Sequence, residues 1–538
     1  MSETAAPSAS TAQSGGPTHR QIVTVLTGLM LGMFLGALDQ TIVSTAIRVI
    51  ADQLHGQTMQ AWVTTAYLIA STITTPLYGK LSDIYGRKPL YLTAISLFLV
   101  GSLLCGISNS IYELAAFRAI QGLGGGGLMS LALTIIADLV PPRQRSRYQG
   151  YFMAVFGTSS VVGPVVGGLF AGMDSFLGVD GWRWVFLVNL PVGIVALAVV
   201  AKVLNVRTER VRHRIDYLGA ASLVVLLVPV LTVAEQGREW GWLSSTSLVM
   251  YAIGALGLVL FVLAERRMGA EALLPLRMFR LPSFRMGNLL NFIVGVGMFG
   301  GLMSMPLYLQ IVQGLTPTEA GLLMLPMTAG IMTSSAVVGR LIAKTGRLKI
   351  FPVIGSAVMA VALFLFSFIG VDTSLVQVSL TALIMGAGLG MLMQTLTIVV
   401  QTDATPRDMG VATASVNLFR QTGGTVGAAA FLSVLFSTVG GRIAEAMRAA
   451  ATSPDFTGAL RDPAVLADPA NRAFLTALHG GGGLDLNDTS FLYGLDPRLA
   501  RPVLEGFSSS MDTVFMVGGT VMVVAFLLTW LLRDVRLD

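Results

Sequence analysis

The sequence GKLSDIYGRKP, at residues 79–89, returns 260 positions later (339 − 79 = 260) as GRLIAKTGRLK, at residues 339–349. Four positions are identical in the two copies: Gly79 and Gly339, Leu81 and Leu341, Gly86 and Gly346, Arg87 and Arg347. The same shift carries Gly163 onto Gly423 and Gly167 onto Gly427. Because distant residues match at one offset, the chain is predicted to consist of two duplicated halves.

The composition of the chain places it in a membrane. Of its 538 residues, 54% are apolar and 12% are charged, and the mean hydropathy is +0.73. Average soluble proteins carry about twice that charge. A backbone in lipid must satisfy its hydrogen bonds internally, in a helix or a closed barrel. The apolar runs have the length of a spanning helix, about 20 residues, and lack the period of two expected of barrel strands.

The apolar runs predict fourteen spans, and the basic residues predict that both termini are cytoplasmic. Lys and Arg residues favour cytoplasmic loops. With a cytoplasmic N-terminus, most of the 35 Lys and Arg residues fall in cytoplasmic segments, whereas the short outer loops hold only Arg48, Arg183 and Arg238. An odd number of spans would break this alternation. The predicted fold is therefore an all-α polytopic membrane protein.

The predicted spans divide the chain into two six-helix halves and an insertion. The divisions are a disordered cytoplasmic tail at 1–20, the N-terminal half at 21–205, a central two-helix insertion with cytoplasmic linkers at 206–280, and the C-terminal half at 281–538. The last half includes a long extracytoplasmic loop at 439–510. This loop is expected to be a plain linker, and a cap on the outer face or a helix on the membrane surface are the alternatives. Duplicated halves around a midplane cavity are a transporter architecture.

Several motifs within the predicted spans point to one family. They are LDQTIVSTAI at 38–47, RAIQGLGGGGL at 118–128, GTSSVVGPVVGG at 157–168, WRWVFLVNLPVG at 182–193 and NLFRQTGGTVGAA at 417–429. Together with GKLSDIYGRKP they resemble the major facilitator superfamily, specifically its fourteen-helix drug:proton antiporter branch of multidrug exporters. The resemblance covers the chain except for the N-terminal tail and the long outer loop. It implies the major facilitator fold and a proton-driven exporter.

The resemblance gives the proton-coupling role to Asp39 and Arg118. An ionised carboxylate at membrane depth is costly, so an acid kept there is by default a proton or cation site. A buried guanidinium stays charged and needs a partner, so Arg118 is predicted to contact Asp39 or a carbonyl of the first helix. Protonation of Asp39 would then release Arg118, which is a switch. A static structural pair is the alternative.

The duplicated loop motif is expected to gate the cytoplasmic side. Its residues are Gly79, Asp83, Gly86, Arg87 and Lys88. Gly79 and Gly86 permit tight turns and close helix approach, and Asp83 can pair with Arg87 or with the N-terminus of a facing helix. Plain positive charge on the cytoplasmic side is the alternative, which accounts for Lys88 but not for the glycine spacing.

The motif of the fifth predicted helix resembles the antiporter-specific motif of the superfamily. Its residues are Gly157, Gly163, Pro164, Gly167 and Gly168. Pro164 removes a backbone hydrogen bond and bends the helix, and the glycines let another helix lie against it. The resemblance implies export rather than import, because exporters carry this motif and importers typically lack it.

A glycine run in the fourth predicted helix has two interpretations. Gly122, Gly124 and Gly127 satisfy the dinucleotide-binding pattern G-x-G-x-x-G, but no strand precedes them and no acid follows at about 20 residues. The run is therefore predicted to be a helix-packing face of small residues.

The substrate cavity is expected to be mostly apolar, with Gln121, Arg420 and Arg48 as possible polar residues. Packing of Arg420 against Gln421 or backbone carbonyls is the alternative. No second carboxylate lies deep in a predicted span, which favours neutral or singly charged lipophilic compounds over dications. The predicted function is proton-coupled export of lipophilic small molecules or drugs. Export or flipping of a cell-envelope lipid or lipophilic metabolite is the alternative.

Other classes of protein fit the sequence poorly. We find no P-loop and no H-E-x-x-H or G-x-S-x-G site, so a secondary transporter is predicted and not an enzyme. One cysteine, Cys105, and four scattered histidines predict no metal site and no cofactor, with the proton gradient as energy source. The expected partners are the substrate, protons and membrane lipid, with no nucleic acid. The chain is expected to act as a monomer in the cell membrane.

Overall fold

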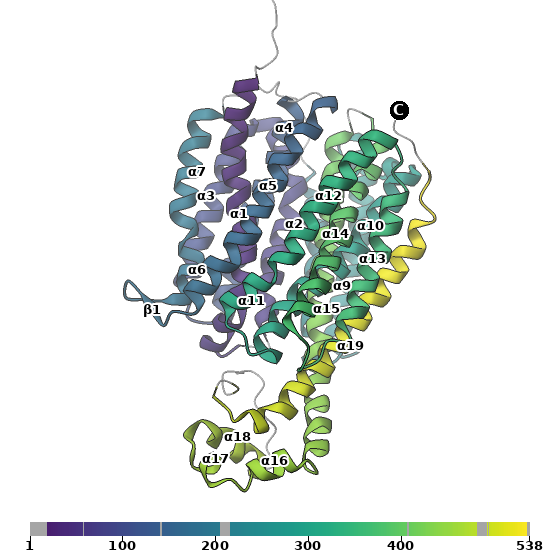
Figure 1. The fold of residues 1–538 in the computed structure, drawn as a ribbon. Coiled ribbons are helices and arrows are strands. Elements are labelled where there is room, and N and C mark those ends of the chain that lie inside the picture. The colour runs from purple at the N-terminus through teal and green to yellow at the C-terminus, as the bar shows by residue number, and fades with distance from the viewer. Residues whose placement is uncertain are drawn as a thin grey trace, which may run out of the picture.

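A computed structural model describes residues 19–56, 59–139, 142–204, 216–405, 408–480, 492 and 494–534. These residues form a long bundle of helices (Figure 1). The predicted disordered tail, apart from residues 19 and 20, lies outside the described residues. Most of the linker before the central helix pair, 205–215, lies outside them too.

The helices follow the predicted order. The first half comprises α1 (His19–Gln53), α2 (Gln60–Tyr85), α3 (Arg87–Gly106), α4 (Ile111–Leu139), α5 (Pro142–Ala171), the hairpin β1 (Ser175–Phe176) and β2 (Val179–Asp180), η2 (Gly181–Arg183), α6 (Trp184–Leu187) and α7 (Asn189–Val203). The central pair is α8 (Tyr217–Trp240) and α9 (Ser245–Met268), followed by η3 (Gly269–Glu271) and η4 (Leu276–Arg280). The second half comprises α10 (Pro282–Leu307), the π-helical turn η5 (Tyr308–Val312), α11 (Pro317–Leu323), α12 (Leu325–Thr345), α13 (Ile350–Phe366), α14 (Leu375–Thr402), α15 (Met409–Ala450), α16 (Pro454–Ala459), α17 (Pro463–Ala467), α18 (Pro469–Gly480) and α19 (Pro497–Thr529).

The helices agree with the predicted polytopic all-α fold. Among the described residues, 11 helical segments are long and apolar enough to cross a membrane. Two further apolar helices are shorter, Gly157–Ala171 within α5 and Ile350–Phe366, and α2 is not among either group. The all-α membrane fold is thus confirmed, whereas the count of fourteen spans stays a prediction.

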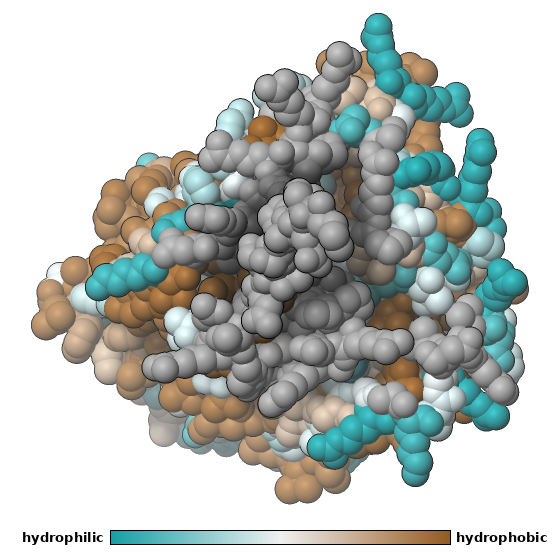
Figure 2. Space-filling model, turned by 90° about the horizontal axis from the view of Figure 1, so that it is seen from above, coloured by the Kyte–Doolittle hydropathy of each residue, from teal (hydrophilic) through white to brown (hydrophobic). Residues whose placement is uncertain are grey.

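Both ends of the described chain lie at one end of the bundle, as the predicted topology requires (Figure 1). Seen from that end, hydrophilic side chains lie along the edge of the face and hydrophobic ones make up the flanks (Figure 2). Which side of the membrane this end faces remains a prediction from the positive charges. We call this end the inner end and the opposite end the outer end.

The duplication predicted from the sequence is confirmed by the helix ends. Shifted by 260, α3 at 87–106 would cover 347–366, and α13 ends at that same residue, Phe366. Shifted likewise, α1 at 19–53 would cover 279–313, where α10 and η5 run from 282 to 312. The glycines that follow α2 and α12, Gly86 and Gly346, both have positive φ, 96° and 66°. Glycine adopts this conformation without steric cost, which explains why both copies keep it.

The central helix pair lies over a seam between the two halves. One apolar cluster joins Ile69 and Ile73 of α2, Leu227 of α8 and Leu418 of α15. Since α2 belongs to the first half and α15 to the second, α8 covers the line along which they meet. The second helix of the pair, α9, leaves apolar side chains such as Leu256 and Leu263 more than half exposed, which suits a lipid-facing surface.

The predicted outer loop at 439–510 is largely helical. α15 continues to Ala450 and α19 begins at Pro497, so both helices extend into the predicted loop. Between them, α16, α17 and α18 form a helical projection at the outer end (Figure 1). Its apolar core includes Phe456, Phe474 and Leu499, all nearly inaccessible. The expectation of a plain linker was wrong, because these apolar side chains are spaced to bury one another and to extend the core of the second half.

An arginine with two acidic partners links segments at the surface of the projection. The Arg498 guanidinium lies 3.0 Å from Asp496 and 3.1 Å from Asp462. The pKa of Asp462 lies below its usual 3.8, because the backbone N–H of Ala464 and the side chain of Arg498 both donate to its carboxylate. Hydrogen bonds from Arg498 likewise lower the pKa of Asp496. The contribution of these carboxylates to stability is therefore present above the unfolded pKa and lost as the pH falls through the folded one.

We predict that the projection keeps its protection against protease from pH 7 to pH 5 and loses it only in stronger acid, below pH 3.8. Limited proteolysis of the purified protein at several pH values, with an acid-tolerant protease such as pepsin at the low end, measures this. Arg498→Ala should weaken protection at pH 7 as well. Loss of protection between pH 7 and pH 5 in the wild type would contradict the assignment.

Candidate functional site

Asp39 and Arg118 form a buried ion pair in the first half. Arg118 Nη1 of α4 donates to Asp39 Oδ2 of α1 at 2.6 Å, and both side chains are almost inaccessible, at 1% and 0%. Arg118 Nε also donates to the carbonyl of Val63 in α2 at 3.1 Å. The guanidinium lies 4.3 Å from the centre of the Tyr67 ring, a cation–π contact. The structure thus brings together the two residues proposed for proton coupling.

Three neutral side chains complete the shell around Asp39. Gln121 Nε2 and Asn189 Nδ2 both donate to Asp39 Oδ1 at 2.8 Å. Gln121 also accepts from Arg118 at 2.6 Å and donates to Ser102 at 2.7 Å. Gln121 was predicted to line the cavity, but its side chain is fully buried and serves Asp39 instead.

Nothing in the amino-acid sequence singled out Asn189 or Ser102. Asn189 lies in WRWVFLVNLPVG, which marked the region but not the contact. Ser102 carries no signal, because a serine in an apolar helix usually bonds its own backbone. Only the packing of α3 and α7 against α1 and α4 brings the Asn189 amide to the carboxylate and the Ser102 hydroxyl to Gln121 and Asn189, from which it accepts.

Glycines allow the helices around the pair to approach closely. A Cβ on Gly124 of α4 would stand 2.5 Å from Ala94 O and Phe98 N of α3, and one on Gly122 would stand 3.0 Å from Tyr67 Cα of α2. A Cβ on Gly101 would stand 2.6 Å from the Cβ of Gln121. Cβ atoms do not approach other heavy atoms this closely in proteins, so only glycine fits at these three positions. The helix-packing interpretation of the glycine run is confirmed.

The loop motif has one tight turn and one buried arginine. Gly86 separates α2 from α3 with φ at 96°. Arg87 donates to the Ser82 hydroxyl and, at 3.5 Å, to the Gly79 carbonyl. Among the described atoms nothing lies within 4 Å of a Cβ built on Gly79, so its predicted role in close helix approach is not seen here. The side chain of Asp83 lies outside the described residues, and Lys88 is half-buried.

The motif of α5 packs this helix against both halves of the protein. A Cβ on Gly163 would stand 2.6 Å from Thr41 Cβ, and one on Gly167 would stand 2.8 Å from Ile42 O, both in α1. One on Gly168 would stand 2.5 Å from Thr318 Cα in α11, and one on Gly157 would stand 2.7 Å from Met332 Cε in α12. A Cβ on Gly321 of α11 would in turn lie 3.0 Å from Pro164 Cα. The predicted approach of other helices to this motif is confirmed.

A second contact between the halves lies at the outer end of α1. Arg48 Nη1 donates to the carbonyl of Gln310 in η5 at 2.8 Å, and Gln310 Nε2 donates to the carbonyl of Thr45 at 3.2 Å. Arg48 was placed in an outer loop by the sequence, but α1 continues to Gln53 and buries it to 1% exposure. Arg48 therefore joins the halves at their outer end and does not line an open surface.

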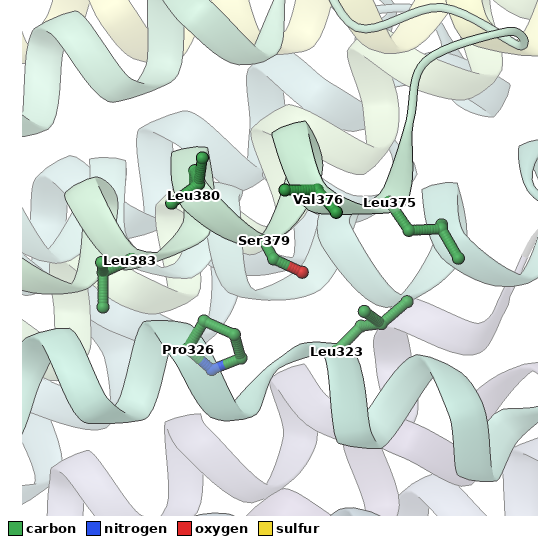
Figure 3. A pocket seen from close by; sticks show the side chains of 7 residues that line it. All are labelled: Leu323, Pro326, Leu375, Val376, Ser379, Leu380 and Leu383. Carbon is green, nitrogen blue, oxygen red and sulfur yellow. The ribbon is translucent and has the colours of Figure 1, made fainter.

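An open apolar groove of about 300 Å³ lies between α11, α12 and α14. Its lining is Leu323, Pro326, Leu375, Val376, Ser379, Leu380 and Leu383 (Figure 3). Apart from the Ser379 hydroxyl, these side chains are apolar, and none titrates. The groove can hold an apolar chain but has no group that could couple transport to protons.

The described part of the chain contains no cluster of three His, Cys, Asp or Glu side chains able to hold a metal ion. Cys105 is buried, 3.8 Å from Gln121 Oε1. The chemistry available near Asp39 is therefore that of a carboxylate, a guanidinium, two amides and a hydroxyl. Such groups can exchange a proton and rearrange hydrogen bonds.

Comparisons with known proteins give the same family as the motifs. Residues 29–428 match the family model described as Major Facilitator Superfamily. The multidrug transporter protein MdtP of Bacillus subtilis is 33% identical over 96% of this chain and 93% of its own length. A tetracycline resistance determinant of Streptomyces rimosus is 41% identical over 60% of this chain and 92% of its own length.

A solved structure shares the fold at low sequence identity. It is a bacterial homologue of the human lysosomal transporter Spinster, in an inward-facing and unoccupied conformation. The TM-score is 0.63 and the identity is 17%, covering 97% of this chain and all of the other. With its many apolar helices, the chain is a multi-pass protein of the plasma membrane and a transporter rather than an enzyme. It belongs to the Major Facilitator Superfamily.

Proposed function

We propose that this transporter exports lipophilic small molecules or drugs in exchange for protons. The observation that carries the proposal is the buried ion pair of Asp39 and Arg118, enclosed by Gln121 and Asn189. A carboxylate and a guanidinium buried together cost desolvation energy that a merely structural contact seldom repays. Ionisable groups within spanning helices are therefore functional by default. The names of the relatives in Bacillus and Streptomyces support a drug as substrate.

The proposed cycle uses the pair as a proton-controlled switch. With the inner end open, Asp39 is ionised and bound to Arg118 while substrate enters from the cytoplasm or the inner leaflet. After the halves rock, a proton from outside neutralises Asp39, weakens its hold on Arg118 and promotes release of substrate. The proton is then carried inward. Each charge moved down the membrane potential supplies about 2.3 kcal/mol per 100 mV.

The route from this pair to the second half is short. Thr41 lies two residues after Asp39 and donates to the carbonyl of Ser159 in α5 at 3.0 Å. One to two turns further along α1, Thr45 and Arg48 bond Gln310 of the second half. A shift of α1 on protonation would therefore act on both contacts.

The test is proton-driven uptake into inverted membrane vesicles of two dyes of opposite charge, cationic ethidium and anionic 1-anilinonaphthalene-8-sulfonate, for wild type and Asp39→Asn. We expect a proton gradient to drive uptake in the wild type and the variant to lose it, because asparagine cannot carry a proton. Asp174→Asn, the same change at an exposed acid, is the matched control and should be as active as wild type. Equal activity of Asp39→Asn and wild type would place coupling elsewhere.

Export of a cell-envelope lipid or lipophilic metabolite is the second candidate. The apolar groove between α11, α12 and α14 favours it, because a groove of this lining can accept an acyl chain. Absence of transport of either dye by the wild type, together with accumulation of an envelope lipid when the protein is lost, would support this candidate over a drug.

A further inference from the structure

Arg420 is an interior cation for which the described residues provide no acidic partner. It lies in α15, and its Nη2 donates to Asn417 Oδ1 at 2.8 Å. Among the described residues no carboxylate lies within ion-pair distance of it, whereas Arg118 has Asp39. A guanidinium does not give up its proton in a protein. A charge of this kind in a membrane interior is costly unless something neutralises it.

Arg420 belongs to a polar stripe along one face of α15. Thr413, Asn417 and Arg420 recur at helical spacing, and all three are partly exposed. Thr413 accepts from Gln401 of α14 at 2.7 Å. One turn beyond Arg420, a Cβ on Gly424 would collide with the Phe299 ring of α10.

The neighbouring faces of α15 show where this stripe points. On one side, a Cβ on Gly423 or Gly427 would stand 3.0 Å or less from the α10 backbone. On the other side, Thr72 of α2 donates to Gln421 at 3.4 Å. The polar stripe lies between the face that meets α10 and the face that meets α2, and therefore points between the two halves and away from lipid. Partial exposure there means access to the transport pathway.

We propose that Arg420, held in place by Asn417, binds the anionic head group of the transported substrate. The substrate class is then an amphiphilic anion with a carboxylate, sulfonate or phosphate on an apolar body. A guanidinium offers a planar fork of donors that matches such oxyanions. The proposal rests on the proposed export function for the identity of the pathway, and it assigns the charge of the substrate.

Binding of two matched probes tests this assignment. The probes are 11-(dansylamino)undecanoic acid and its methyl ester, which share an apolar body and differ in charge. The protein is held in phosphatidylcholine nanodiscs, and dansyl fluorescence gives the affinities. The wild type should bind the acid at least about tenfold more tightly than the ester, and Arg420→Gln should remove that preference, as for loss of a hydrogen bond to a charged group.

Two variants serve as controls. Arg420→Lys keeps the charge but not the fork and should retain part of the preference. Arg501→Gln removes an exposed arginine at the outer end and should bind both probes as the wild type does. Equal affinity of the wild type for acid and ester, or an unchanged preference in Arg420→Gln, would overturn the proposal. If Arg420→Gln does not fold, the proposal is tested by whether the wild type binds the acid more tightly than the ester and by whether Arg420→Lys weakens that preference.

The same assay separates the two sources of such an anion. Displacement of the acid by phosphatidylglycerol in the nanodisc identifies a lipid head group as the ligand of Arg420, and no displacement identifies a free amphiphile. Failure of the transport proposal is distinguishable, because binding does not require protons.

Discussion

Replacing Arg118 with glutamine is expected to stop proton-driven export and to destabilise the fold by about 3–5 kcal/mol, the cost of breaking a buried ion pair from one side. Asp39 would be left with neutral donors in a site that excludes water. Either it stays charged at high cost or it stays protonated, and in both cases it cannot exchange a proton. Thermal unfolding of the purified protein and vesicle uptake measure the two effects.

A double-mutant cycle separates the pair from its surroundings. The combination of Asp39→Asn with Arg118→Gln removes both charges, so it should cost less stability than the sum of the two single variants. Transport should nevertheless stay lost, because no proton carrier remains. Arg118→Lys should be intermediate in stability, since lysine cannot reach Asp39, Gln121 and Val63 together. Additive losses of stability would show that the pair is not an energetic unit.

A bulky residue at position 168 should hold the outer end open. In Gly168→Leu, the new Cβ would collide with the backbone of Thr318, which cannot rotate away as a side chain can. Helices α5 and α11 must then separate. Export should fall by about tenfold or more, because destabilising the state that is closed at the outer end by about 1.4 kcal/mol lowers its population tenfold.

Accessibility of a cysteine at Thr45 reports on this separation. Thr45 lies at the outer contact and is 1% exposed, so Thr45→Cys should resist an impermeant maleimide added from outside. Added to this background, Gly168→Leu should make it reactive, while the native Cys105 stays buried and unlabelled. Gly441→Leu is the control, because no described atom lies within 4 Å of a Cβ there. Unchanged labelling in Gly168→Leu would show that α5 and α11 do not close this end.

The amino-acid sequence by itself determined the class of fold and its duplication. Apolar runs of spanning length form helices whatever surrounds them, since in lipid the backbone has no other partner. The repeated glycines at 86 and 346 mark the ends of corresponding helices, α2 and α12, and the offset of 260 aligns helix ends in the two halves. The sequence also predicted that Arg118 contacts Asp39 or a carbonyl of the first helix, because a buried guanidinium needs a partner, and the structure shows the contact with Asp39.

Contacts between distant segments were decided by the tertiary structure alone. Ser102 and Asn189 are ordinary residues in apolar helices, and only the packing of α3 and α7 brings Asn189 to Asp39 and Ser102 to Gln121. The helical projection at the outer end was missed because its short helices have no spanning length to reveal them. The position of Arg48 against Gln310 depends on how the halves meet. Hydropathy is a local property of the chain, whereas these contacts depend on which helix faces lie against each other in the assembled bundle.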